Sequence, residues 1–403
     1  MNLNKKEYDV VVVGAGPIGS TAARYAAKNG ASVLMVEDHG SIGSPVGCTG
    51  LLSTRALSEC DVEPSETFVL NKVRGAFVHP MNGEELPIDG KETKAYVVSR
   101  KIFDRTLANM AAKEGVEISL KTRATGIEKN IREQYVQITQ EGVERKIRTK
   151  VIIAADGVRS NIAKIAGLGQ VDKVLSGIQI EGAYQSHDTD FVELFVGSQA
   201  PGFFAWTVPV SEEISRIGIA IDAGQKSAQE CLENLLKTNK HLSSRYNGGN
   251  LDIVMGGIPI GPLDNTYSDG VLIVGDAAGQ VKPTSGGGIY TGAICAKIAG
   301  EVAAMAALEN DTTAMRLSEY DRRWRAEIGK ELALGMRIHK FIGGLKDEEM
   351  GELINSMNEP QILDTITIYG DMDHPSILIK KLLNPANSRS LFRIFRAFAK
   401  SVL

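Results

Sequence analysis

A glycine-rich turn near the N-terminus has the spacing that binds the diphosphate of a dinucleotide. Gly14, Gly16 and Gly19 form a GxGxxG motif that follows four consecutive valines and begins an alanine-rich segment. The first glycine permits the turn, the second lets the backbone approach a pyrophosphate, and the third lets a helix pack closely on a strand. Glu37 ends the next apolar segment, where a carboxylate can accept hydrogen bonds from a ribose without a 2′-phosphate. The pattern therefore predicts FAD or NAD, rather than NADP, bound by Gly14, Ala15, Gly16, Pro17, Ile18, Gly19 and Glu37.

A second glycine cluster, far along the chain, favours FAD over NAD. Gly275 and Asp276 follow an apolar segment at 271–274, and three consecutive glycines begin at Gly286. Asp276 can bind a ribityl hydroxyl; if it were only a helix N-cap, Pro283 and the three glycines would be unexplained. Backbone amides at the start of the following helix would face the flavin N1–C2=O edge, where reduction accumulates negative charge. We therefore predict non-covalent FAD and no metal, with further contacts from Gly286, Gly287, Gly288 and Ile289.

The elements that position these motifs follow from the hydrophobic pattern. Residues 8–13, 17–29 and 31–36 predict a strand–helix–strand unit that contains the first turn. Ser99 is expected to cap a helix over 99–114. Alternation over 127–147 predicts a hairpin, and 151–155 and 270–275 predict two further buried strands. Alternating segments between 176 and 261 predict an antiparallel sheet, and a helix is expected over 288–308.

These elements predict an α/β fold in which a Rossmann-like FAD-binding domain carries an inserted antiparallel-sheet domain. At 403 residues, the chain is long enough for two or three packed units. The predicted cofactor domain is discontinuous, over 1–75, 100–175 and 262–310. The substrate sheet domain is expected over 76–99 and 176–261, and a helical region over 311–403.

Composition argues against several other classes of protein. A formal net charge of −4 gives no basic excess, so nucleic acid is not expected as a partner. The four cysteines form no CxxC pair, so we expect neither a disulfide framework nor an iron–sulfur or zinc site. The first residues lack the pattern of a secretory signal, and the apolar segment 293–308 is interrupted by Lys297 and Glu301. We therefore expect a cytoplasmic protein.

A third motif connects the chain to a known group of flavoproteins. Asp156 and Gly157 follow the predicted strand at 151–155, with Ser160 three residues further on. Together with the GxGxxG turn and Gly275–Asp276, this resembles the p-hydroxybenzoate hydroxylase superfamily of FAD proteins. Three further segments resemble geranylgeranyl reductases over roughly residues 8–310. They are PVGCTG at 45–50, FAWTVP at 204–209 with Gly218 after it, and Arg100 followed by Phe103 and Asp104.

The resemblance implies further site residues. It places Cys48, Thr49 and Gly50 beside the flavin, where Cys48 either takes part in the chemistry or is a small packing residue. It also implies that Asp156 belongs to the cofactor site, that Arg100 contacts FAD and that the backbone of Ala124 contacts the adenine edge. Phe204, Trp206 and Pro209 would wall an apolar tunnel to the flavin, or else form ordinary sheet core.

The activity implied by the resemblance is the saturation of isoprenoid double bonds. The expected protein is an FAD-dependent oxidoreductase acting on CH–CH groups. It would transfer hydride from reduced flavin to geranylgeranyl chains of archaeal-type membrane-lipid precursors, with NADPH, ferredoxin or another reductant as the electron donor. The alternative on the same fold is an FAD-dependent monooxygenase, either an aromatic hydroxylase or a halogenase. An electron-carrier flavoprotein related to the quinone reductases of electron-transfer flavoprotein is disfavoured. Those proteins carry a cluster of cysteines toward the C-terminus, whereas the last cysteine of this chain is Cys295.

The C-terminal segment suggests contact with a membrane surface. Apolar residues at 391, 392, 395, 398, 399 and 402 follow helical spacing, and basic residues at 389, 393, 396 and 400 fall largely on the remaining face. A basic amphipathic helix of this kind suits an anionic membrane surface, which predicts peripheral membrane association. The alternative is a helix that packs on the protein and exposes its basic face to solvent.

Overall fold

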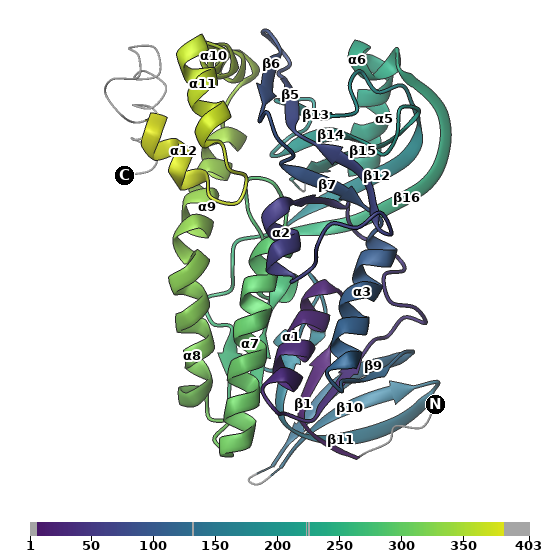
Figure 1. Ribbon diagram of the computed structural model, residues 1–403, viewed down its shortest axis with the longest axis vertical. Helices are drawn as coiled ribbons and strands as arrows, with labels where there is room; N and C mark the ends of the chain where they lie inside the picture. Colours follow the sequence, from purple (N-terminus) through teal and green to yellow (C-terminus); the bar gives the residue numbers. More distant parts are fainter. Residues whose placement is uncertain (1–5, 131–132, 223, 225, 383–403) are drawn as a thin grey trace.

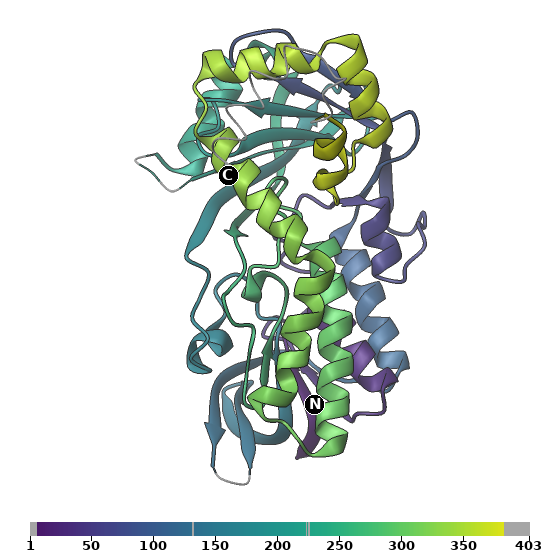
Figure 2. The same cartoon turned by 90° about the vertical axis from the view of Figure 1, so that its left-hand side faces the viewer.

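The computed structural model describes residues 6–130, 133–222, 224 and 226–382. A mainly parallel sheet with helices against it forms one end of the molecule, and a second, mainly antiparallel sheet forms the other end (Figure 1). The last helices run along one side of the molecule and reach both ends (Figure 2). The predicted α/β fold with a Rossmann-like part, an inserted sheet and a helical C-terminal region is confirmed.

The first sheet has the strand order β17-β18-β11-β1-β2-β8, with the β9–β10 hairpin attached to β11. The four valines of β1 are buried because alternate side chains enter two different cores, one on each face of the sheet. The strands are β1 (Glu7–Val13), β2 (Val33–Val36), β8 (Glu117–Ser119), β9 (Thr122–Lys129), β10 (Gln134–Gln140), β11 (Val143–Ala154), β17 (Tyr267–Ser268) and β18 (Val271–Ile273).

Two local predictions were wrong. The expected hairpin and the separate strand after it share one continuous strand, β11, which pairs with β10 at its start and lies between β1 and β18 at its end. Its burial changes from alternating to continuous where both faces become covered, and this change looked like two elements in the sequence. Ser99 does precede helix α3 (Arg100–Lys113), but its side chain makes no capping hydrogen bond.

Helices α1 (Pro17–Lys28) and α7 (Ile289–Glu309) pack on one face of this sheet, and their backbones are in close contact with each other. A Cβ atom on Gly300 of α7 would lie only 2.4 Å from the carbonyl oxygen of Ala22 in α1. The alanine and glycine content of both helices is therefore a packing requirement. Among the described helices, α7 alone has the length and composition of a membrane span, but most of it is buried in this core.

The second sheet has the order β16-β12-β15-β14-β13-β5-β6. All its neighbouring pairs are antiparallel except β5 and β13, and the strands β5 and β6 at one edge come from an earlier part of the chain than the rest of the sheet. Helix α5 (Ala228–Thr238) and the short α6 (Lys240–Ser243) pack on one face. The strands are β5 (Gly75–His79), β6 (Leu86–Asp89), β12 (Lys173–Tyr184), β13 (Phe191–Val196), β14 (Phe204–Pro209), β15 (Ile214–Ile221) and β16 (Tyr246–Ile260).

Smaller elements join the two ends of the molecule. A three-stranded sheet pairs β7 with both β3 and β4, and α2 follows β3 directly. Helices α8 and α9 form one long column through a π-helical turn at Arg325–Gly329. The predicted amphipathic helix at 389–402 lies outside the described residues. The remaining bounds are β3 (Leu51–Ser53), β4 (Val69–Val73), β7 (Ala95–Val98), α2 (Thr54–Glu59), α4 (Asn161–Ile165), α8 (Ala314–Trp324), α9 (Lys330–Gly343), α10 (Asp347–Met357), α11 (Pro360–Tyr369) and α12 (Pro375–Leu382).

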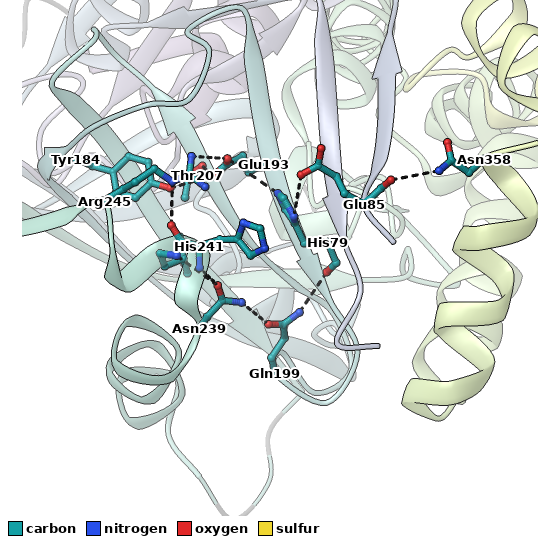
Figure 3. Close-up of polar contacts among 11 residues, drawn as sticks. His79, Glu85, Tyr184, Glu193, Gln199, Thr207, Asn239, His241, Arg245 and Asn358 are labelled. Atoms are coloured by element: carbon teal, nitrogen blue, oxygen red, sulfur yellow. Dashed lines mark hydrogen bonds and ion pairs between the residues drawn. The ribbon is translucent and has the colours of Figure 1, made fainter. Parts of the chain in front are cut away.

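A polar network is buried in the second sheet (Figure 3). The carboxylate of Glu193 accepts hydrogen bonds from Tyr184 Oη at 2.9 Å and Thr207 Oγ1 at 3.0 Å. Arg245 Nη1 donates to the same carboxylate at 2.7 Å. Burial raises the pKa of the Tyr184 phenol, so it remains a donor. The network thus satisfies a carboxylate that lies almost completely away from water.

His79 beside this network should make the stability depend on pH. Burial lowers its pKa from 6.5 to about 4, against the attraction of Glu193. Between pH 6.5 and 4 the unfolded state binds this proton and the folded state does not, so we expect about 3 kcal/mol of stability to be lost as the pH falls through this range. Urea unfolding across this range should show a steeper loss for the wild type than for His79→Gln; equal slopes would contradict the assignment. The charged or titratable groups around His79 are Glu85, His187, Glu193, His241 and Arg245.

Candidate active site

The GxGxxG turn contains glycines of two kinds. A Cβ atom on Gly14, which has φ +101°, would lie 2.3 Å from the carbonyl oxygen of Ala155, and one on Gly19 would lie 1.9 Å from the carbonyl oxygen of Gly14. The fold itself therefore requires these two glycines. Gly16 differs, because it has φ −66° and its Cβ would meet nothing within 4 Å. The open space at Gly16, next to the free backbone amides at the start of α1, fits a diphosphate.

The predicted ribose carboxylate lies against the same turn. Glu37 follows β2, and its Oε2 accepts a hydrogen bond from the backbone amide of Ala15 at 2.8 Å. Its Oε1 lies 2.6 Å from Nδ1 of His39. These contacts fix the carboxylate beside the diphosphate position. Ala124 lies buried in β9, and its contact with adenine stays a prediction.

The structure brings the second glycine cluster to the first. Ile18 of α1 packs closely on Gly275 and Gly292. A Cβ atom added to Gly275 would lie 2.9 Å from the Ile18 side chain, and one added to Gly292 would lie 2.6 Å from it. Asp276 in turn lies against Gly288, where a Cβ atom would be 2.9 Å from Oδ1 of the carboxylate. Two segments more than 250 residues apart therefore form one continuous surface, as the sequence predicted.

Asp276 has the character of a ligand-binding group. Among the described residues none donates a hydrogen bond to its carboxylate, and burial raises its pKa although Arg100 attracts the charged form. The N-terminus of α7 begins beside it at Gly288, whose backbone has no side-chain cap. An unpartnered carboxylate next to a free helix N-terminus fits the ribityl chain and the N1–C2=O edge of FAD.

Arg100 interacts electrostatically both with Asp276 and with Cys48, which together with Thr49 and Gly50 forms the cysteine loop. It forms a bidentate pair with Asp104, at 2.8 and 3.0 Å. Burial alone would lower the pKa of Arg100, but Cys48 and Asp104 raise it above its usual range, so the side chain stays charged. Direct contact between Arg100 and FAD stays a prediction.

The cysteine loop is fastened by a residue that the sequence analysis missed. Arg216 of β15 donates to the carbonyl oxygens of Thr49 at 2.6 Å and Val98 at 3.1 Å, and to Glu181 at 2.8 Å. Gly50, with φ +75°, leaves room for this guanidinium, because a Cβ atom there would lie 2.8 Å from Arg216 Nη1. The available signal was the position of Arg216, two residues before Gly218.

A cavity of about 810 Å³ lies between the glycine loops and the second sheet. Cys48 and Thr49 line it on one side, and Gly286 and Gly287 line it beside the predicted flavin edge. Apolar side chains of β13 and β14 form another wall, and residues of α9 and of the segment between α11 and α12 complete it. Its volume is within the range of small-molecule sites, and it directly adjoins the predicted cofactor surface.

Trp206 lies across the cavity wall. Its indole ring covers Gly218 on the neighbouring strand, where a Cβ atom would be 2.4 Å from the ring. The indole Nε1 donates a hydrogen bond to Oε1 of Gln179 at 3.1 Å. The ring of Phe204 lies edge-on to the indole, with 5.9 Å between the ring centroids. Phe204, Trp206 and Val208 line the cavity, but Pro209 does not: it is buried on the opposite side of the strand. The expectation that Pro209 helps to wall the cavity was therefore wrong.

Asp156 supports the turn by capping a helix. Its carboxylate accepts hydrogen bonds from Ser160 Oγ at 2.5 Å and from the backbone amides of Asn161 and Ile162 at 3.0 and 3.2 Å. It thereby holds the start of α4 next to the GxGxxG turn. Whether it also contacts FAD stays a prediction.

Comparison with known proteins places this site in a family. Residues 9–170 match the family model of FAD-dependent oxidoreductases. The digeranylgeranylglycerophospholipid reductase of Methanocaldococcus jannaschii is 37% identical over 358 residues, which cover 87% of this chain and 91% of that protein. Digeranylgeranylglycerophospholipid reductase 1 of Methanothermobacter thermautotrophicus is 32% identical over 97% of this chain and 98% of its own length.

A solved structure extends the similarity to three dimensions. The geranylgeranyl bacteriochlorophyll reductase-like protein of Thermoplasma acidophilum has a TM-score of 0.83 and 27% identity, over 94% of this chain and 98% of that one. The glycines at 14–19 and 286–288, the buried Asp276 and the matching family model agree on FAD as the cofactor. This chain is a member of the digeranylgeranylglycerophospholipid reductase family of FAD-dependent oxidoreductases.

Proposed function

We propose that this protein saturates geranylgeranyl double bonds in precursors of archaeal-type membrane lipids. The observation that carries the proposal is the cavity, which joins the glycine loop at Gly286–Gly287 to the apolar wall around Trp206. An isoprenoid chain is long, apolar and flexible, so it needs a large apolar site that holds one double bond still. The names of the M. jannaschii and M. thermautotrophicus relatives support this class of substrate.

The residues of this chain would bind, orient and shield the substrate. When bound, reduced FAD would supply a hydride to one carbon of the double bond, and a proton from a group of the site or from water would go to the other carbon. Trp206 and Phe204 hold the chain against the predicted flavin edge, while Arg216 and Gly50 fix the Cys48 loop on the other side. The enclosing walls exclude water, which strengthens the electrostatic effect of the α7 N-terminus.

An external reductant and a membrane contact complete the proposal. NADPH, ferredoxin or another donor would reduce the flavin, since the glycine motifs described here account for one dinucleotide only. Because the substrate class is a membrane lipid, we further propose a cytoplasmic enzyme that meets the membrane peripherally. Vesicle flotation with and without residues 383–403 would test this contact, and equal flotation of the two forms would count against the amphipathic tail.

An anaerobic single-turnover experiment tests the activity. The purified yellow protein is reduced with dithionite and mixed with a geranylgeranyl lipid under anaerobic conditions. Reoxidation of the flavin, with a mass gain of about 2 Da for each saturated bond, would support the reductase. A flavin that stays reduced with the lipid, but drives oxygen-dependent hydroxylation of an aromatic compound, would support the monooxygenase instead.

Trp206→Ala should separate substrate binding from cofactor binding. The variant should retain FAD, because Trp206 belongs to β14 of the second sheet and not to the glycine motifs, but lipid turnover should fall by about tenfold or more through lost chain positioning. Phe77→Ala is a matched control, because Phe77 lies on β5 of the same sheet outside the cavity lining. Steady-state turnover and flavin content measure both effects. Unchanged turnover in Trp206→Ala would assign the indole to the sheet core.

A further inference from the structure

The segment between α11 and α12, residues 371–374, contacts the wall of the cavity at three points. Asp371 pairs with Arg55 of α2 at 3.0 Å. Asp373 pairs with Lys282 at 2.5 Å, and His374 Nε2 lies 2.9 Å from the hydroxyl of Tyr290, in the first turn of α7. The three partners come from α2, from the loop that leads into α7 and from the first turn of α7, and all three line the cavity. The helical region is thereby attached to the cofactor site itself.

The central contact is a buried ion pair at the glycine loop. Lys282 and Asp373 are both buried, at 8% and 3% exposure. The backbone amide of Lys282 donates to the carbonyl oxygen of Gly287, and its own carbonyl accepts from the amide of Gly286, so the lysine closes this loop. Its side chain then runs over the loop, because a Cβ atom on Gly287 would lie 3.4 Å from Lys282 Nζ.

The ammonium group of Lys282 would interact electrostatically with a ligand bound at the loop of Gly286 and Gly287. Removing an ammonium and a carboxylate from water is costly, and the pair persists because each charge compensates the other. In such a buried setting, a charge acts strongly over several ångströms because little water screens it. The ammonium end of the pair lies at the glycine loop, and the carboxylate end is held by the C-terminal segment.

We propose that Lys282 and Asp373 together set the reduction potential of the bound flavin, with Lys282 as the positive group and Asp373 as the residue that positions and moderates it. This inference rests on the FAD site of the proposed function. Two electrons and one proton from the external reductant convert oxidised flavin to its reduced anion, which carries the new negative charge on the N1–C2=O edge. Lys282 stabilises that charge and makes the flavin easier to reduce.

The two ends of the pair should move the potential in opposite directions. Lys282→Met leaves a carboxylate near the loop and should make reduction less favourable, whereas Asp373→Asn leaves an uncompensated ammonium and should make it more favourable. We expect each change to alter the equilibrium constant of the two-electron reduction at least about tenfold, which corresponds to about 30 mV. General damage to the site would not produce opposite signs.

The measurement is a spectroscopic titration of the purified, FAD-loaded full chain with dithionite and a reference dye. Because a single variant leaves one buried charge unpaired, the double variant Lys282→Met with Asp373→Asn gives a second measurement. It should lie below the wild type and above Lys282→Met. Lys297→Met is the matched control, since Lys297 forms an ion pair with Asp61 at 3.0 Å further along α7, away from the glycine loop. Its potential should stay at the wild-type value.

The outcomes separate this inference from the proposed function. Opposite shifts in the two single variants support the role of the pair, and where a single variant does not fold, a lowered potential in the double variant supports it. Shifts of the same sign, or shifts no larger than that of Lys297→Met, overturn it even if the enzyme reduces lipid. If the wild type binds FAD and the variants show the predicted shifts, but the wild type does not reduce lipid, the proposed substrate is overturned and the electrostatic role of Lys282 stays intact.

Discussion

Replacement of Arg245 by methionine is expected to lower the free energy of unfolding by about 3–5 kcal/mol. Arg245 Nη1 lies 2.7 Å from Oε1 of Glu193, and the Glu193 side chain is 6% exposed. Without the guanidinium, this carboxylate keeps the hydrogen bonds of Tyr184 and Thr207 but loses its only close cationic partner among the described residues (Figure 3). An uncompensated buried charge is among the costliest single changes in a protein. Urea unfolding at pH 7 measures the loss.

Two further variants test the cause of this loss. Combining Arg245→Met with Glu193→Gln removes the unpaired charge, so the double variant should be more stable than Arg245→Met alone. Arg148→Met removes an exposed cation that pairs with Glu7 at 3.3 Å, and should change the stability by no more than about 0.5 kcal/mol. If Arg245→Met costs as little as Arg148→Met, Glu193 does not depend on its ion pair.

The alanine substitution of Gly16 should weaken FAD binding strongly without harming the fold. Its φ of −66° is one that any residue adopts, and a Cβ atom would meet no protein atom within 4 Å. The cost to the apoprotein should be no more than about 1 kcal/mol, from the poorer N-cap. The added methyl group would occupy the space through which the diphosphate approaches the backbone. We expect FAD affinity to fall about 100-fold or more, which is about 2.7 kcal/mol.

Gly14→Ala is the contrasting variant. Gly14 has φ +101°, and a Cβ atom would lie 2.3 Å from the carbonyl oxygen of Ala155, so the fold itself should lose about 3 kcal/mol through strain and overlap. Thermal unfolding of the apoproteins and flavin titration distinguish the two cases. If Gly16→Ala binds FAD as tightly as the wild type, the diphosphate does not lie against this turn.

The cofactor motifs could be predicted because each depends on local geometry. Gly14 and Gly19 are glycines for steric reasons that act within one turn, and Asp276 follows directly from a buried strand. Strand-face alternation also predicted that Phe204 and Trp206 share one side. The same rule, applied to Pro209, would have placed it on the opposite side, where the structure has it.

The supporting contacts could not be predicted, because hydrogen bonds and ion pairs between residues far apart in the chain leave no local pattern. Arg216 reaches Thr49 across 167 positions, and Lys282 reaches Asp373 across 91. Arg and Lys are mostly exposed in proteins, so their presence in the sequence gave no reason to place them in the site.

What this sequence determined by itself is the dinucleotide turn, the second glycine cradle and the alternation of the cavity wall, since backbone sterics and side-chain periodicity act over a few residues. Only the tertiary structure decided which charges meet behind those motifs, how the cysteine loop is fastened, and that the segment between α11 and α12 brings Asp373 to Lys282. Such contacts form only when segments far apart in the chain come together. They matter for the stability because burial makes an unpaired charge costly, whereas a paired charge is compensated by its partner.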